Sequence, residues 1–292
     1  MDALTALALL LVLLLPVLLA SSHTFVYHFK NVFYVAWMMV IGVVAIPLCL
    51  LSSGWRNVDN MRILAWLTRH VKHLLGLKYH VSGLEHLELE GSYVVISNHQ
   101  SSLDVLGMME ILPDRCTAIA KKELLYAGTV GLVCWLGGVI FINRQKTSDA
   151  KSVMAEAAET MLREKLRVWI FPEGTRNLMG SILPFKKGAF HLAVQAQWSS
   201  PHTATSTSSG KGALIQVWRV KSGMEGGPGW HAVTSCPSLT GTITMKVLPR
   251  IKTKGLTAND ASTLSESAHK LMLATFHEIS ALTAEANGAH GE

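Results

Sequence analysis

The chain has 292 residues, enough for one substantial globular domain together with membrane segments. Only 16% of the residues are charged and 49% are hydrophobic, and the mean hydropathy of +0.31 lies on the membrane side of ordinary soluble composition. The net charge of +6 is not accompanied by a nucleic-acid recognition motif, so anionic lipid surfaces and phosphate-bearing ligands are the expected partners of the charge. The composition therefore argues against a soluble nucleic-acid-binding protein.

Two apolar runs within residues 1–52 predict two N-terminal membrane helices. Residues 3–20 and residues 32–51 are each long enough for a helix that spans the hydrocarbon core. A cleaved signal peptide is the alternative for the first run, but no basic residue precedes that run and a second apolar run follows it at once. Two crossings, or a hairpin that dips into one leaflet, would both leave the following domain on the same side as the N-terminus.

Residues 53–80 form a basic segment directly after the second apolar run. Its charged residues are one acid, Asp59, and five bases, Arg56, Arg62, Arg69, Lys72 and Lys78. Basic residues just beyond a membrane helix favour the cytosolic side, so we expect the rest of the chain to face the cytosol. Apolar side chains recur at helical spacing over residues 61–77, which fits either an interfacial amphipathic helix or a helix packed against the domain core.

Residues 81–292 predict a single α/β domain. Strands are expected at 93–97, 139–143 and 167–171, and helices at 103–112 and 149–166. Such alternation of strands and helices is typical of a sheet layered with helices.

Three further stretches of this domain have a distinctive composition. Residues 124–142 are apolar but interrupted by glycines, which favours a helix, a turn and a buried strand over a third membrane span. Residues 262–279 predict a closing helix. Residues 198–241 are rich in Ser, Thr and Gly, with only residues 213–220 resembling a strand, so we expect this segment to pack poorly.

The four cysteines give no pattern that would define a disulfide framework or a metal site. Cys49, Cys116, Cys134 and Cys236 are far apart in the sequence, and one of them lies within an apolar run. We therefore expect a reducing compartment and no bound metal.

The segment from Ser97 to Asp104 contains the first candidate chemical group. His99 and Asp104 are five residues apart, so on one continuous helix they would point in different directions. They can pair if Ser101 caps the helix, which leaves His99 in the preceding turn. Asp104 would then fix the tautomer of the imidazole, whose other nitrogen removes a proton from a hydroxyl. The alternative is a capping pair of Ser101 and Asp104 beside a turn histidine.

The segment Phe171–Arg176 follows a predicted strand and turns the chain sharply. Arg176 can bind a phosphate in bidentate fashion, and Thr175 can add a hydrogen-bond donor. Glu173 can hydrogen-bond a glycerol hydroxyl or orient the arginine. A surface turn with a local ion pair is the alternative.

A third segment, GGVIFINR, ends a predicted strand with Arg144, a cation suited to the same anion. Lys186 and Lys187 could contribute, although adjacent lysines more often form a solvated face.

The segments NHQSSLD, GGVIFINR and FPEGTR, in that order, resemble the successive signature blocks of the glycerolipid acyltransferase family. Together with AKKELL and LPFKKGAFHLAVQAQ, they are most similar to its 1-acylglycerol-3-phosphate O-acyltransferase branch. The resemblance covers about residues 57–197 and resumes near residues 240–279. It implies a mixed sheet surrounded by helices and an endoplasmic reticulum membrane location with the catalytic domain in the cytosol.

The resemblance also implies roles for individual residues. His99 would be the general base and Asp104 its partner. The acceptor phosphate and glycerol would be bound by Gly138, Arg144, Glu173, Gly174, Thr175 and Arg176.

The activity that the resemblance implies is transfer of a fatty acyl group from acyl-CoA to the sn-2 hydroxyl of lysophosphatidate. Acyl-CoA would be a co-substrate, with no tightly bound cofactor and no obligate protein partner. The alternatives are an acyltransferase for glycerol-3-phosphate or another lysophospholipid, a non-catalytic membrane protein, and a serine hydrolase using Ser101 or Ser102.

One departure from the family lies directly after AVQAQ, where the family has a short strand and this chain has Trp198 and the Ser/Thr/Gly-rich segment. We expect the sheet to lack that strand, and the activity to be weak or absent as in a splice-type variant.

Overall fold

The computed structural model describes residues 2, 5, 14, 23–143, 147–177, 181–198, 212–222 and 241–288. The helices are α2 (His23–Ser53), α3 (Asn60–Arg69), α4 (Val71–Leu74), α5 (Asp104–Glu110), α6 (Gly128–Leu136), α7 (Thr147–Arg163), α8 (Gly188–Trp198) and α9 (Ala261–Gly288). The strands are β1 (Leu77–Ser82), β2 (Tyr93–Ser97), β3 (Cys116–Lys121), β4 (Ile140–Ile142), β5 (Arg167–Ile170), β6 (Gly212–Ser222) and β7 (Gly241–Lys252). Short 3-10 helices occur at Leu84–Leu87, Lys122–Tyr126 and Ala258–Asp260.

The strands form one seven-stranded sheet in the order β1-β7-β6-β2-β5-β3-β4. The five strands from β6 to β4 run parallel to one another, whereas β7 pairs antiparallel with β6 and parallel with β1. The sheet is therefore mixed, as predicted, and the expected strands at 93–97, 139–143 and 167–171 are confirmed as β2, β4 and β5 to within one residue at each end.

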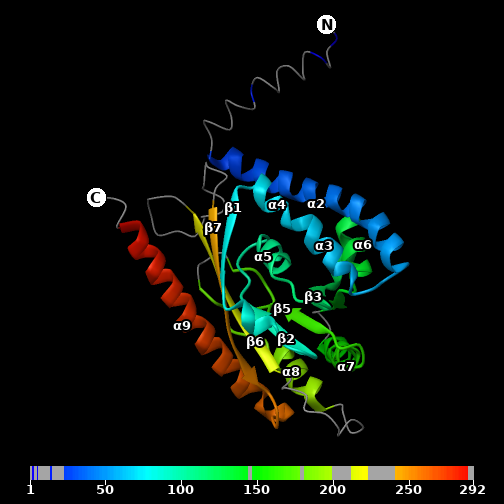
Figure 1. Ribbon diagram of the computed structural model, residues 1–292, viewed down its shortest axis with the longest axis vertical. Helices are drawn as coiled ribbons and strands as arrows, with labels where there is room; N and C mark the ends of the chain where they lie inside the picture. Colours follow the sequence, from blue (N-terminus) through cyan, green and yellow to red (C-terminus); the bar gives the residue numbers. More distant parts are fainter. Residues whose placement is uncertain are drawn as a thin grey trace.

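Helices cover both faces of the sheet, because the central strands are apolar on both sides. All five residues of β2 are buried. Val94 and Ile96 belong to the core that β2 shares with α7, α8 and α9, whereas Tyr93 and Val95 belong to the core shared with α2, α3, α5 and α6. Figure 1 shows this sandwich, with α9 on one side of the sheet and α2 on the other. Burial on both faces is typical of parallel strands.

The helix α2 contains the second predicted membrane run. Its residues Val32–Ser53 have a mean hydropathy of 2.4 and are long enough to cross a membrane. One side of α2 packs along the domain, where Ala45 and Cys49 are fully buried and Thr129 Oγ1 donates a hydrogen bond to Met39 O at 2.9 Å. The other side is apolar and exposed, so α2 lies along the domain with an apolar face left uncovered. Of the first predicted membrane run only residues 5 and 14 are described, and that helix stays a prediction.

The helix expected at 61–77 is shorter and broken. It divides into α3 and α4, and the chain turns into β1 at Leu77, whose side chains alternate between half-buried and exposed. Met61 and Leu64 of α3 are buried in the core beneath α2, which confirms core packing for that face. The opposite face remains open to solvent, with Trp66 60% exposed.

The strand β6 corrects the expectation that residues 198–241 leave a gap in the sheet. It lies between β2 and β7, parallel to the first and antiparallel to the second. The register sets Ile96 of β2 opposite Ile215. The predicted strand 213–220 is thus confirmed and slightly longer, and its backbone pairs with strands on both sides. Residues 199–211 and 223–240 lie outside the described residues.

Candidate active site

The site forms where β2 and β5 end side by side. Both strands are parallel neighbours, so the loops that follow them leave the same edge of the sheet. The loop after β2 contains His99 and leads into α5, and the loop after β5 contains Glu173 and Arg176. Below both loops, Trp169 Nε1 donates a hydrogen bond to Ser97 Oγ at 2.8 Å and links the two strand ends.

The local turn differs from the predicted cap. Ser101 Oγ accepts a hydrogen bond from the backbone N–H of Leu103 at 3.1 Å, and α5 begins only at Asp104. Asp104 is therefore the first helical residue, whereas capping by Ser101 would have set it in the third position. The short turn before α5 brings its carboxylate back toward His99.

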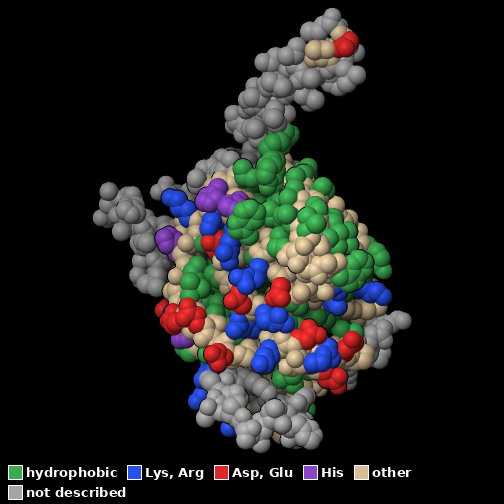
Figure 2. Space-filling view, turned by 45° about the vertical axis from the view of Figure 1, so that its right-hand side comes forward, with side chains coloured by type: hydrophobic (Ala, Val, Ile, Leu, Met, Phe, Trp, Pro, Cys, Tyr) green, Lys and Arg blue, Asp and Glu red, His purple; other side chains and the backbone are tan. Residues whose placement is uncertain are grey.

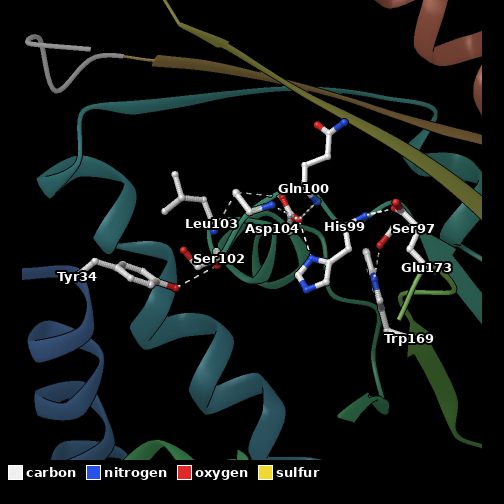
Figure 3. Close-up of polar contacts among 10 residues, drawn as sticks. Tyr34, Ser97, His99, Gln100, Ser102, Leu103, Asp104, Trp169 and Glu173 are labelled. Atoms are coloured by element: carbon white, nitrogen blue, oxygen red, sulfur yellow. Dashed lines mark hydrogen bonds and ion pairs between the residues drawn. The ribbon is translucent and has the colours of Figure 1, made fainter. Parts of the chain in front are cut away.

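His99 and Asp104 are in direct contact, as predicted. Nδ1 of His99 lies 2.8 Å from Oδ2 of Asp104. The same oxygen accepts hydrogen bonds from the backbone N–H groups of Gln100, at 2.6 Å, and Ser101, at 2.8 Å (Figure 3). A carboxylate only accepts, so Nδ1 carries the proton in this contact. The Asp104 side chain is 4% exposed and that of His99 is 19% exposed, so the acid is enclosed and the ring reaches solvent.

The imidazole is fixed in orientation by a second contact. The ring of His99 stacks on Phe171, with centroids 4.2 Å apart and planes inclined by 24°. Nε2, the other ring nitrogen, makes no hydrogen bond to the described residues. Nε2 is thus the atom that can exchange a proton with a ligand.

The loop after β5 holds the backbone of His99 on both sides. Glu173 Oε1 accepts a hydrogen bond from His99 N at 2.6 Å, and His99 O accepts one from Asn177 N at 2.9 Å. Glu173 Oε2 accepts a hydrogen bond from Leu183 N at 2.9 Å. Burial raises the pKa of Glu173, and the hydrogen bonds from His99 and Leu183 oppose that rise. Because Glu173 is buried with both oxygens occupied, this geometry suits bracing of His99 better than contact with a glycerol hydroxyl.

The remaining residues of that loop have distinct placements. Gly174 has a φ of +70°, and a Cβ atom there would lie 2.8 Å from Lys186 Nζ. Glycine therefore allows the chain to turn beneath the lysine. Thr175 and Arg176 are exposed and available to a ligand.

Gly138 does not come near His99. It precedes β4, which is separated from β2 by β5 and β3, so it lies roughly 14 Å across the sheet at about 4.8 Å per strand. Its φ is +73°, and a Cβ atom there would lie 2.7 Å from Val58 Cγ2, which gives glycine a packing role. Arg144 lies outside the described residues.

Sequence reasoning missed three residues at this edge. Phe171 was in the motif, but nothing in the sequence showed that its ring would stack on His99. Lys121 ends β3 at the same edge and is exposed, and its position after a strand was an available signal. Tyr34 reaches the site from α2, where its hydroxyl donates a hydrogen bond to Ser102 O at 3.3 Å, and no local pattern could have revealed that contact.

The hydroxyl of Ser101 is not placed to serve as a nucleophile. Ser101 Oγ lies 3.3 Å from Asp104 Oδ1 and accepts from Leu103, whereas His99 turns its proton-bearing nitrogen toward Asp104. The arrangement is a histidine and carboxylate pair open to an external hydroxyl, on an α/β sheet with a cationic loop beside it. This combination fits an acyl-transfer site.

Comparisons with known proteins agree with this class. The family model described as Acyltransferase matches residues 78–207. The human 1-acyl-sn-glycerol-3-phosphate acyltransferase alpha is 47% identical over 91% of this chain and 87% of its own length. Its human beta counterpart is 44% identical over 97% and 94%, and the Saccharomyces cerevisiae enzyme of the same name is 31% identical over 87% and 79%. The chain belongs to the 1-acyl-sn-glycerol-3-phosphate acyltransferase family.

The fold is also that of a solved structure. The crystal structure of PlsC from Thermotoga maritima, a 1-acyl-sn-glycerophosphate acyltransferase, superposes with a TM-score of 0.61 at 18% identity. The similarity covers 87% of this chain and 98% of that protein.

Proposed function

We propose that this chain transfers a fatty acyl group from acyl-CoA to the sn-2 hydroxyl of lysophosphatidate and releases phosphatidate and CoA. The observation that carries the proposal is the contact of His99 Nδ1 with Asp104 Oδ2 at 2.8 Å, which leaves Nε2 free to meet a ligand, while the adjacent loop after β5 carries the exposed Arg176. The curated names of the relatives support lysophosphatidate as the acceptor.

In the proposed reaction, His99 acts as a general base. Nε2 takes the proton of the acceptor hydroxyl while that oxygen bonds to the thioester carbonyl carbon of acyl-CoA. The tetrahedral intermediate then expels the CoA thiolate, which takes the proton back from His99. Asp104 stabilises the imidazolium between these two steps, and general-base assistance of this kind contributes about 10²- to 10⁴-fold.

Positioning of His99 and of the acceptor supplies a further part of the rate enhancement. Glu173 and Asn177 hold the backbone of His99, and Phe171 supports its ring, so little reorganisation is needed when the hydroxyl approaches. Arg176 and Thr175 would bind the acceptor phosphate, with Arg144 as a further cation after β4.

The placement of α2 favours a domain that lies on one leaflet. The packed side of α2 follows the domain from Tyr34, which contacts Ser102, to Ser53, whose Oγ hydrogen-bonds Asn60 at 2.9 Å. A perpendicular α2 would therefore carry the catalytic turn into the hydrocarbon. Exposed apolar side chains gather at the end of the molecule that carries α2 (Figure 2). With α2 in the membrane plane, this apolar side would face the acyl chains and the catalytic turn would lie at the interface, where a lysophospholipid acceptor would be reached. We place the protein on the endoplasmic reticulum membrane, with the catalytic domain facing the cytosol.

An acceptor panel tests the proposal. Purified protein in phospholipid vesicles is given labelled acyl-CoA with lysophosphatidate, glycerol-3-phosphate or lysophosphatidylcholine. We expect lysophosphatidate to have the highest kcat/KM. Since β6 completes the sheet between β2 and β7, we also expect clear turnover. Preference for another acceptor would reassign the substrate, and the absence of acyl transfer to all three would contradict the proposal.

A further inference from the structure

The catalytic turn of residues 101–103 is in contact with the apolar helix α2. Tyr34 projects from α2 toward this turn, and its hydroxyl donates to the carbonyl oxygen of Ser102 at 3.3 Å (Figure 3). Ser102 lies between His99 and Asp104, so the bond is made within the turn that brings these two side chains together.

Apolar packing accompanies this hydrogen bond. Leu103 and Leu106 are buried in a cluster against which Tyr34 and Met38 of α2 pack. The turn is thus held from the α2 side, while Glu173 and Asn177 hold His99 from the β5 side.

The hydroxyl of Tyr34 is the unusual part of this contact. The neighbouring aromatic residues Phe25, Phe29, Phe33 and Trp37 form a stacked row along α2. A phenylalanine at position 34 would provide the same packing without the cost of removing a hydroxyl from water. Tyr34 is half-buried, and the hydrogen-bond partner of its hydroxyl is the catalytic turn.

We infer that Tyr34 is a positioning residue that ties the turn between His99 and Asp104 to α2, so that catalytic geometry depends on how this helix packs against the domain. The inference rests on the proposed function, because the geometry that it protects is that of the general base. Tyr34 touches neither substrate in this role and acts through the backbone of Ser102.

The test compares Tyr34→Phe with a matched control, Tyr93→Phe. Tyr93 is a buried tyrosine whose hydroxyl also donates to a backbone carbonyl, that of Leu87 at 2.7 Å, at the amino end of β2 away from the site. Both variants lose one hydroxyl and one hydrogen bond to a carbonyl. Only the Tyr34 variant loses a contact with the catalytic turn.

Initial rates are measured in vesicles with lysophosphatidate and acyl-CoA varied in turn. For Tyr34→Phe we expect kcat to fall about two- to tenfold, the effect of one ordinary hydrogen bond, with both KM values within twofold of wild type. Tyr93→Phe should keep the wild-type kcat, even if its melting temperature falls more. An unchanged kcat for Tyr34→Phe would overturn the inference, and so would a rise confined to the lysophosphatidate KM, which would assign the hydroxyl to acceptor binding.

His99→Ala in the same assay separates the two claims. If wild type is active and His99→Ala is not, the proposed function stands and the Tyr34 comparison decides the inference alone. A wild-type chain without acyl transfer would overturn the proposed function and the inference with it. An active His99→Ala variant would overturn the general-base assignment and the inference but would leave the acyl transfer standing.

Discussion

Replacing Asp104 with asparagine removes a charge from the site while nearly preserving its shape. In the wild-type protein, Oδ2 accepts hydrogen bonds from His99 Nδ1, Gln100 N and Ser101 N, at 2.8, 2.6 and 2.8 Å. Two of these donors are backbone N–H groups, which would orient the carbonyl oxygen of asparagine to the same place. His99 Nδ1 then keeps an acceptor and the ring keeps its tautomer, so the variant isolates the effect of the charge.

The loss of transition-state stabilisation expected for Asp104→Asn has a lower and an upper bound. A hydrogen bond to a charged group contributes about 1.5–3 kcal/mol and one between neutral groups about 0.5–1.5 kcal/mol, so the lower bound is roughly 1 to 1.5 kcal/mol. With the two charge centres about 4 Å apart, the attraction of the carboxylate for the imidazolium of the transition state is about 4 kcal/mol at an effective dielectric constant near 20, which we take as the upper bound. We therefore expect kcat of Asp104→Asn to fall about 10- to 10³-fold.

The comparison variant is Asp104→Ala, which removes all three hydrogen bonds and leaves Nδ1 of His99 without its acceptor. By analogy with other histidine and aspartate pairs, its kcat should fall about 10³- to 10⁴-fold. Both variants are assayed in vesicles at saturating acyl-CoA and lysophosphatidate. Equal losses for the two variants would refute the idea that the backbone donors preserve the tautomer, and a wild-type kcat for Asp104→Asn would refute any role for the charge.

Two further predictions concern the loop after β5. Arg176→Ala should raise the KM for lysophosphatidate about tenfold or more and that for acyl-CoA little, because a charge-assisted bond to phosphate is lost; steady-state kinetics showing the reverse pattern would assign Arg176 to the donor. Burial raises the pKa of Glu173 above its usual 4.5. At pH values above 4.5 the folded protein therefore binds more protons at Glu173 than the unfolded chain does. The contribution of Glu173 to the free energy of unfolding consequently falls as the pH rises through this window. The unfolding free energy of Glu173→Gln relative to wild type should therefore increase through that window in denaturant titrations, whereas a constant or decreasing difference would contradict this account.

The sequence predicted the strands β2, β4, β5 and β6 but missed the other three described strands. The strands β2 and β5 are short runs of apolar residues bounded by turns, and burial on both faces leaves such runs little alternative. The strands β1, β3 and β7 were not predicted. In β1, polar residues alternate with apolar ones directly after a helical pattern, and β3 reads CTAIAK, whose small residues give a weak signal. Their pairing partners are distant in sequence and decide the outcome.

The contacts of the candidate site also divide into those that the sequence could predict and those that it could not. The contact of His99 with Asp104 could be predicted because both lie within one turn of chain. The bracing of His99 by Glu173 could not, since it depends on the adjacency of β2 and β5, 74 residues apart at these positions. Tyr34 is 68 residues from Ser102 and lies in an apolar run that showed only membrane affinity. Local sequence patterns could not predict contacts between residues that are distant in the chain and meet only in the folded protein.

The proposed reaction depends most directly on a proton passing from the acceptor hydroxyl to the imidazole of residue 99. Wild type and His99→Ala are purified, reconstituted in the same vesicles and given labelled acyl-CoA with lysophosphatidate, and the formation of labelled phosphatidate is followed. We predict phosphatidate formation by the wild-type protein and a loss of at least about 10²-fold in the variant at equal membrane incorporation. Comparable rates of phosphatidate formation by the two proteins would contradict the general-base mechanism.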